Sequence, residues 1–449
     1  MPEPGCPKDR GDLSRRRRAP GLSAAQERLT DEPRPTRAVT PRHVVFYLPN
    51  LAGGGAERSI LRLSQALAER GHQVELIVNQ AAGPYRSLVS ASVRLTVLER
   101  ARKVAGRAAL VRLALGNREA RAVLARLACA RRPIIKLAYI PALAAVLAER
   151  RPEVLISALT RANLAALLAC RLAELKSRVV VTERNHLSAE LAERREQGDN
   201  PAGWASLIDL VNACYPWADV VAGVSHGVAD DLAASTTLSR DTIRTLYNPV
   251  VGPDLAGTGS MPLPAGIWPI TTPDTTPVIL AVGRLEPQKD FLTLIRAVAE
   301  LRRTRPVHLV IAGEGVLREA LCAEIRRLAL DEVVHLVGWV DAPAVLMHRA
   351  SLFVLSSLYE GLPGVLIEAM GCGCPVVATD CPSGPREILL DGRYGPLVPV
   401  ADVPALAEAM QASLDHPVAR EALLARAGDF SIETSTKRFE RLIEDLATR

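Results

Sequence analysis

The chain has 449 residues, of which 48% are hydrophobic, and this predicts two domains of about 150–200 residues each with substantial cores. The formal net charge of +6 is unevenly distributed, because residues 100–151 carry thirteen Lys or Arg and only two acidic side chains. Tyr139 is the only aromatic residue of that basic region. This argues against nucleic acid as a partner and favours an anionic surface such as a membrane.

The sequence shows no membrane-spanning or targeting pattern. It contains no run of about 18 apolar residues, and the four arginines at 15–18 precede no apolar stretch that could form a signal-peptide core. Residues 1–41 are basic, rich in Pro and without periodicity, so we expect a disordered tail there. We expect a cytoplasmic protein that works at the inner face of the plasma membrane.

The eight cysteines form no disulfide-like framework, as is typical of a reducing compartment. Cys372, Cys374 and Cys381 are close enough in sequence to raise the possibility of a metal site. Small, semi-buried packing residues are the favoured interpretation of the three.

The folded part begins with a strand, a glycine loop, a helix and a second strand. Residues 43–50 are typical of a buried strand, residues 51–56 of a glycine-rich loop and residues 57–70 of a helix, and residues 74–78 form the next strand. This order predicts a doubly wound α/β domain over residues 42–250, with ligands beyond the carboxyl ends of its strands. The loop lacks the spacing of a dinucleotide-binding fingerprint.

The basic region allows two interpretations. Arg107, Arg112 and Arg118 lie among Ala, Leu and Val, and the apolar residues 137–148 lie between basic flanks. An amphipathic helix with arginines at its edges can lie in a membrane interface. A surface helix packed on the sheet, with its arginines solvated, fits the same pattern.

A polar cluster follows the apolar strand at residues 178–182. Glu183, Arg184, Asn185 and His186 are four consecutive hydrogen-bonding residues at a strand end, where doubly wound folds bind their ligands. A lone histidine is more often structural, but the cluster as a whole indicates a functional site.

A Pro-, Gly- and Thr-rich linker over residues 251–276 leads into a second α/β domain over residues 277–428, and residues 429–449 are predicted to form a helix that crosses back. Arg284 and Lys289 follow the first strand of this domain. Two cations beside a glycine at a strand end suit a diphosphate, because Arg offers a planar donor fork and Lys a point charge.

The most informative stretch reads SSLYEGLPGVLIEAMGCGCPVVATD, which predicts a strand end, a Gly-Pro loop, a helix and another strand. Free N–H groups near Gly364, Val365 and Leu366 at the helix start suit a phosphate. Glu360 and Glu368 bracket that position. Since carboxylates repel a phosphate, these two are expected to bind hydroxyl groups of the sugars at its two ends.

The spacing of these residues resembles a family signature. Glu360 and Glu368 are separated by seven residues and followed by EAM, small residues and PVVAT, as in retaining, nucleotide-sugar-dependent glycosyltransferases of family 4. The loop at Gly54 and the GR-L-x-x-x-K segment at Arg284 and Lys289 are similar to two further family segments. The resemblance begins at residue 43 and implies a GT-B fold, in which two Rossmann-like domains face each other across the active-site cleft.

The resemblance also implies a role for each candidate residue. These are Glu360, Asn185 and His186 as catalytic residues near the transferred sugar; Glu368 at the ribose; Val340 at the base; Arg284, Lys289, Gly364, Val365 and Leu366 at the diphosphate; Gly54, Gly55 and Glu57 in the N-terminal loop; and Glu183 and Arg184 on the acceptor side.

The implied reaction transfers a hexosyl or N-acetylhexosaminyl unit from a UDP- or GDP-linked sugar to a glycan or lipid-linked acceptor, in cell-surface polysaccharide or glycolipid synthesis. No Asp-x-Asp motif occurs in the chain, and we expect neither a metal nor a cofactor nor a nucleic-acid partner. Two other classes stay open. A nucleotide-sugar 2-epimerase of the same fold would need acid/base carboxylates at the sugar's C2, and a non-catalytic module would bind the nucleotide without turnover.

Overall fold

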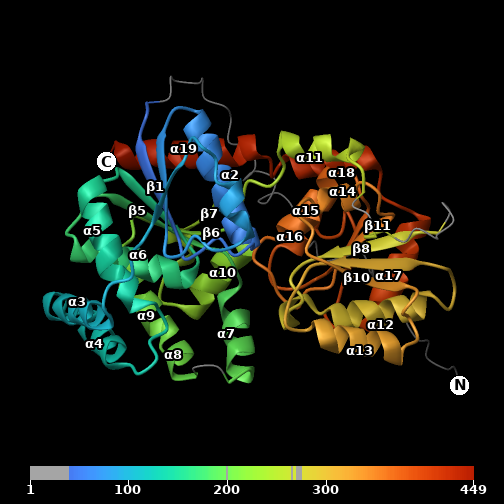
Figure 1. Cartoon of the computed structure of the whole chain (residues 1–449), viewed down its shortest axis with the longest axis horizontal. Helices are drawn as coiled ribbons and strands as arrows, with labels where there is room; N and C mark the ends of the chain where they lie inside the picture. Colours follow the sequence, from blue (N-terminus) through green and yellow to red (C-terminus); the bar gives the residue numbers. More distant parts are fainter. Residues whose placement is uncertain (1–39, 199–200, 264–265, 269–275, 449) are drawn as a thin grey trace, which may run out of the picture. The chain divides into compact units, whose positions relative to one another are not determined.

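The computed structural model describes residues 40–198, 201–263, 266–268 and 276–448, so the predicted tail at 1–41 lies almost wholly outside it. The folded chain contains two separate parallel sheets, each with buried hydrophobic clusters on both of its faces. Helices cover these faces (Figure 1). The predicted α/β class, with two Rossmann-like sheets, is confirmed. We call the part before residue 251 the first lobe and the part after residue 276 the second lobe.

In the described residues, the first sheet has seven parallel strands in the order β3-β2-β1-β4-β5-β6-β7. The strand order reverses between β1 and β4, which is the kind of switch point where doubly wound sheets bind ligands. Val, Ile and Leu fill both faces of the central strands, as expected for strands covered on each side. The strands are β1 His43–Leu48, β2 Gln73–Val78, β3 Arg94–Val97, β4 Val154–Ala158, β5 Arg178–Glu183, β6 Val220–Gly223 and β7 Ile243–Thr245.

The helices of the first lobe follow from the spacing of apolar residues. In α2, Ile60, Leu63 and Leu67 are buried on one face, and the helix ends before Gly71, whose φ of 93° favours glycine. Its start lies at Gly55, two residues before the predicted one. The helices are α2 Gly55–Glu69, α3 Lys103–Gly116, α4 Arg121–Cys129, α5 Ile140–Arg150, α6 Thr160–Leu172, α7 Leu187–Glu196, α8 Pro201–Ala205, α9 Leu207–Cys214 and α10 His226–Ser235.

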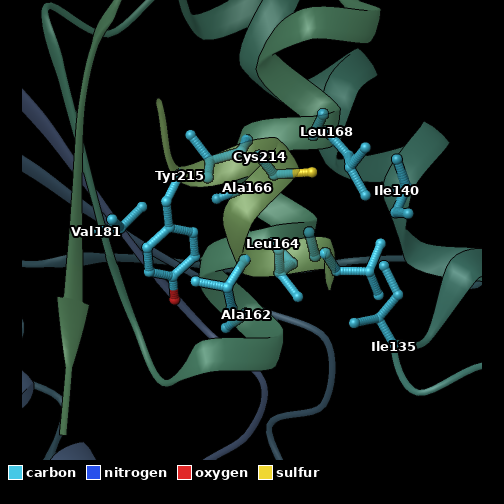
Figure 2. Packing of buried hydrophobic residues seen from close by; sticks show 14 of the residues in the cluster. Ile135, Ile140, Ala162, Leu164, Ala166, Leu168, Val181, Cys214 and Tyr215 are labelled. Carbon is cyan, nitrogen blue, oxygen red and sulfur yellow. The ribbon is translucent and has the colours of Figure 1, made fainter. Parts of the chain in front are cut away.

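The basic region divides into an exposed and a buried part. Ile140 and Leu147 of α5 are completely buried. Figure 2 shows Ile140 beside Leu168 of α6, in the core that also contains Tyr215. Most apolar residues of 137–148 therefore belong to the protein core, and the exposed large apolar side chains of residues 100–151 lie on α3.

The second sheet has six parallel strands within the described residues, in the order β10-β9-β8-β11-β12-β13. The glycine-rich stretch forms β11, α15 and β12 of this sheet, as predicted. The strands are β8 Val278–Val282, β9 His308–Ala312, β10 Val334–Gly338, β11 Leu352–Leu355, β12 Val376–Thr379 and β13 Leu397–Val398; the helices are α12 Phe291–Leu301, α13 Arg318–Arg327, α14 Ala344–Met347, α15 Gly364–Gly371, α16 Pro385–Leu389, α17 Val403–Asp415 and α18 Arg420–Gly428.

Two segments connect the lobes. The predicted linker at 251–276 contains a short helix, α11 (Pro253–Gly257). Leu255 of this helix packs closely against Gly371 of α15, since a Cβ atom on Gly371 would lie 2.6 Å from the Leu255 side chain. The C-terminal helix α19 (Ile432–Ala447) returns to the first lobe and contacts α2 (Figure 1). Its face that joins the core of the first sheet consists of Phe439, Leu442, Ile443 and Leu446.

No helix in the described part of the chain is long and apolar enough to span a bilayer. The seven cysteines at described positions are free. Cys372, Cys374 and Cys381 are buried, and burial raises the pKa of Cys372 and Cys381 to about 12. These thiols are packing residues, as favoured from the sequence.

Candidate active site

A cavity of about 490 Å³ is lined by residues of both lobes. Its walls are loops that follow the carboxyl ends of β1, β4 and β5 in the first lobe and of β8, β9, β10 and β11 in the second. This is the position at which doubly wound sheets bind ligands. The predicted site residues that line it are Gly54, Gly55, Glu57, Arg184, Asn185, Arg284, Lys289, Val340, Glu360, Gly364, Val365 and Glu368.

Lys289 and Glu360 form an ion pair in this cavity. Lys289 Nζ lies 2.5 Å from Glu360 Oε1, and Ser357 Oγ donates to the same oxygen at 2.7 Å. The two charged side chains are only 15% and 8% exposed. Two hydrogen bonds hold the loops that carry them together, from Ser356 Oγ to the Lys289 carbonyl and from Gln288 Nε2 to the Tyr359 carbonyl. The cation and the carboxylate are therefore fixed relative to each other.

Arg284 approaches the cavity from the end of β8. Its guanidinium pairs with Glu286 at 3.0 Å and is 54% exposed, so it can reorient toward an anion in the cavity. Glu57, in the first turn of α2, faces it from the first lobe. Burial raises the pKa of Glu57, while Arg284 and Arg184 favour its charged form.

The start of α15 also lines the cavity. Gly364 and Val365 lie in the wall, and within the described residues no backbone carbonyl accepts their N–H groups. Leu366 differs from the prediction, because its N–H donates to the Pro363 carbonyl at 3.1 Å and its side chain is completely buried. Two N–H groups, rather than three, are therefore available to a phosphate here.

Two arginines that the sequence analysis missed contact Glu368. Nη1 of Arg62 lies 3.1 Å from Glu368 Oε1 and Nη1 of Arg58 lies 3.7 Å from it. Both arginines belong to α2 of the first lobe, so this contact joins the lobes. The sequence signal that could have revealed them is their spacing of four residues directly after the glycine loop, because residues i and i+4 lie on the same face of a helix.

Close approaches explain two glycines of the first-lobe loop, Gly53 and Gly54, whereas a Cβ atom on Gly55 would meet nothing within 4 Å. A Cβ atom on Gly54 would lie 2.4 Å from Glu57 Oε2, and one on Gly53 would lie 2.9 Å from the Trp339 ring. Gly53 has a φ of 98°, which also favours glycine. Trp339 directly precedes Val340, so this loop lies against the wall that the sequence assigns to the base.

Only part of the polar cluster after β5 lines the cavity. Arg184 is buried and donates to Thr182 Oγ1 and Ser59 Oγ at 3.1 Å each and to Asn248, and no carboxylate among the described residues forms an ion pair with it. Burial lowers its pKa to about 10. Asn185 also lines the cavity.

Glu183 and His186 do not lie in the cavity wall, contrary to the prediction. Glu183 is 2% exposed and accepts hydrogen bonds from Thr160, Asn163 and Tyr215, because successive side chains of a strand point to opposite faces. His186 directly precedes α7, and its Nδ1 lies 3.4 Å from Asp231 Oδ1 on α10. The side chains of Glu183 and His186 thus have their partners within the first lobe.

No group of three or more His, Cys, Asp or Glu side chains in the described parts of the chain is arranged to hold a metal ion. The positive groups of the cavity are side chains and backbone amides. They come from both lobes, and the acidic groups Glu57, Glu360 and Glu368 lie among them.

Two family descriptions match the chain. Residues 53–251 match "Glycosyltransferase Family 4" and residues 276–416 match "Glycosyl transferases group 1". The two matches together include every candidate residue discussed above.

Two enzymes of Campylobacter jejuni are similar to the chain. It is 33% identical over 286 residues to N-acetylgalactosamine-N,N'-diacetylbacillosaminyl-diphospho-undecaprenol 4-alpha-N-acetylgalactosaminyltransferase, covering 63% of this chain and 72% of the relative. It is 25% identical over 415 residues to GalNAc-alpha-(1->4)-GalNAc-alpha-(1->3)-diNAcBac-PP-undecaprenol alpha-1,4-N-acetyl-D-galactosaminyltransferase, covering 90% and 98%.

Among solved structures, Anabaena HepE in complex with UDP-glucose superimposes with a TM-score of 0.67 at 17% identity, covering 90% of this chain and 99% of HepE. At this identity the likeness concerns the fold, and it confirms the predicted GT-B architecture.

Proposed function

The chain belongs to glycosyltransferase family 4, and on that premise we propose that it transfers a hexosyl or N-acetylhexosaminyl unit from a UDP- or GDP-linked sugar to a glycan or lipid-linked acceptor. The transfer retains the anomeric configuration and needs no metal ion. It takes place at the inner face of the plasma membrane, in the synthesis of a cell-surface polysaccharide or glycolipid. The acceptor class is supported by the C. jejuni relatives, which by name act on undecaprenol-linked glycans.

One observation carries the proposal: Lys289, Arg284 and the start of α15 line the same cavity as Glu360 and Glu368. When a glycosidic bond to a diphosphate breaks, negative charge develops on the leaving diphosphate. Cations and backbone amides that already line the cavity stabilise that charge. The two carboxylates are placed to accept hydrogen bonds from hydroxyl groups of the sugar and the ribose.

The first prediction tests the donor. The full chain is incubated with UDP- and GDP-linked hexoses and N-acetylhexosamines, and the release of nucleoside diphosphate is measured. We expect slow hydrolysis of one donor, which an acceptor accelerates and a chelator leaves unchanged. A free 2-epimeric nucleotide-sugar formed without acceptor would identify an epimerase instead. Binding without turnover over many acceptors would identify a non-catalytic module.

The membrane contact that we propose lies on α3. Val104, Val111 and Leu115 are 75%, 48% and 71% exposed and share one helix face. Arg107 and Arg112 lie exposed beside them. An exposed apolar face bordered by arginines fits the interface of an anionic bilayer, where the apolar residues insert and the guanidinium groups meet lipid phosphates.

The second prediction concerns this face. The protein should co-sediment with phosphatidylglycerol vesicles at low salt and be released at high salt, because surface charges are screened. Val104→Asp/Leu115→Asp should lower the bound fraction about tenfold, since each substitution removes an apolar group from the interface. Val316→Asp is the matched control, because Val316 is 84% exposed on the second lobe. Equal binding to neutral vesicles, or equal loss in the control, would contradict the assignment.

A further inference from the structure

Two arginines of the cavity wall lie over one tryptophan. Arg161 is the second residue of α6, and its guanidinium carbon lies 5.3 Å from the centre of the Trp204 ring. Arg194 comes from α7, and its guanidinium carbon lies 5.6 Å from the same ring. Trp204 itself is 4% exposed. Each guanidinium group therefore makes a cation–π contact with a buried indole, while the Arg161 side chain stays exposed and Arg194 is half-buried.

This pair is separate from the cations assigned to the donor. Arg161 and Arg194 line the first-lobe wall of the cavity, together with Asn185 and Glu190. Arg284 and Lys289 belong to the second lobe. The connection before α6 passes through Leu159, which has a φ of 81°, a conformation that a leucine rarely adopts and that is more common at functional sites.

No described carboxylate balances the charges of the two arginines. Among the described residues, no carboxylate lies within ion-pair distance of Arg161 or Arg194, although Glu190 is one turn before Arg194 on α7. Arg194 Nη1 donates to the neutral Gln197 Oε1 at 3.2 Å, and its Nε is buried without a partner. Two cations beside one ring repel each other, and an anion that contacts both would offset the repulsion. The amino end of α6, where Arg161 lies, adds partial positive charge.

From this geometry we propose that Arg161 and Arg194 bind a phosphate or diphosphate ester of the acceptor. The inference rests on the proposed function, because it assigns the first-lobe wall to the acceptor. A guanidinium group can donate two parallel hydrogen bonds to phosphate oxygens, so the pair would favour phosphate-linked acceptors over neutral glycans with the same terminal sugar.

The third prediction tests the pair with inorganic diphosphate as the probe. The full chain is first saturated with UDP or GDP, whichever binds more tightly, so that the donor's diphosphate site is filled. Diphosphate is then titrated calorimetrically. Arg161→Gln and Arg194→Gln should each raise its Kd about tenfold or more, the range expected for the loss of a charge-assisted hydrogen bond. The Kd of Arg161→Lys for diphosphate should lie between those of wild type and Arg161→Gln.

Arg171→Gln is the matched control. Arg171 lies on the same helix, over Trp217 at 5.2 Å, but does not line this cavity. The Arg171→Gln variant should bind diphosphate with the same Kd as wild type. The Kd of the nucleoside diphosphate should stay within about twofold in all variants, and so should binding to phosphatidylglycerol vesicles.

Three results would overturn the inference: no diphosphate binding to the nucleotide-saturated wild type, an equal loss in Arg171→Gln, or a parallel loss of nucleotide or vesicle binding. Parallel loss of nucleotide binding would place the pair at the donor, and parallel loss of vesicle binding would make its ligand a lipid headgroup. Failure to bind either nucleotide would contradict the proposed function instead. Diphosphate binding that depends on Arg161 and Arg194 would still support the assignment of the anion site.

Discussion

Lys289→Ala is expected to weaken nucleoside-diphosphate binding about 10–100-fold and to lower turnover at least as much. A charge-assisted hydrogen bond to the diphosphate is worth roughly 1.5–3 kcal/mol, and the Lys289 side chain is only 15% exposed, so solvent screens its charge little. The measurement is a calorimetric titration with UDP and GDP beside initial rates with the donor. Arg284→Ala should act in the same direction, toward the lower end of this range, because its side chain is 54% exposed and solvent screens its charge.

Lys437→Ala is the control for this prediction. Lys437 is also ion-paired, 2.8 Å from Glu433, but it lies on α19 and outside the cavity. Removing Lys289 leaves Glu360 buried without its cation, so melting temperatures must be compared as well. In Lys289→Ala/Glu360→Gln the unpaired carboxylate is gone, and this variant should regain stability without regaining affinity. Wild-type nucleotide affinity in both Lys289→Ala and Arg284→Ala would contradict the assignment of the diphosphate.

The structure of the second lobe agrees closely with the prediction from the sequence, because the sequence signals in this lobe are local. The strand Val278–Val282 ends just before Arg284, as expected, and α15 begins at Gly364, where the glycine loop ends. Glycine and proline determine such boundaries through backbone conformation alone, and the apolar runs between them decide which faces are buried. The cations after β8 could therefore be assigned to the cavity from their position at a strand end.

The predictions of site residues were wrong or incomplete where the direction of a side chain depends on packing. Glu183, Arg184 and His186 are neighbours in sequence, yet only Arg184 reaches the cavity. Tyr215 and Asn163, which hold Glu183 in the core, come from elements distant in the sequence. The contact of Arg58 and Arg62 with Glu368 depends on how the two lobes meet, and a pattern within either lobe could not predict it.

The two glutamates of the signature have different partners, and this suggests different roles. Glu360 belongs to the loop before α15 and contacts Lys289 and Ser357 of its own lobe. Glu368 lies one turn inside α15 and contacts the arginines of α2 in the opposite lobe. A donor whose diphosphate lies at the start of α15 would therefore extend its sugar toward Glu360 and its ribose toward Glu368.

Glu368→Gln should accordingly weaken the binding of both the free nucleoside diphosphate and the donor about tenfold, because a hydrogen bond from a ribose hydroxyl to a carboxylate is stronger than one to an amide. Glu360→Gln should leave nucleoside-diphosphate binding nearly unchanged and lower turnover about 10–100-fold, since its partner is the transferred sugar. The measurement is a pair of titrations with the nucleoside diphosphate beside initial rates for both variants.

Glu324→Gln is the matched control for these two variants. Its carboxylate also pairs with two arginines of the second lobe, Arg296 and Arg327, and these hold its pKa at about 2, but it lies outside the cavity. The Glu324→Gln variant should therefore bind and turn over the donor like wild type. If Glu360→Gln loses nucleotide affinity while Glu368→Gln keeps it, the donor lies in the opposite direction along α15. If neither variant changes affinity or rate, the donor does not bind at α15, because two carboxylates so close to its diphosphate cannot both be replaced without effect.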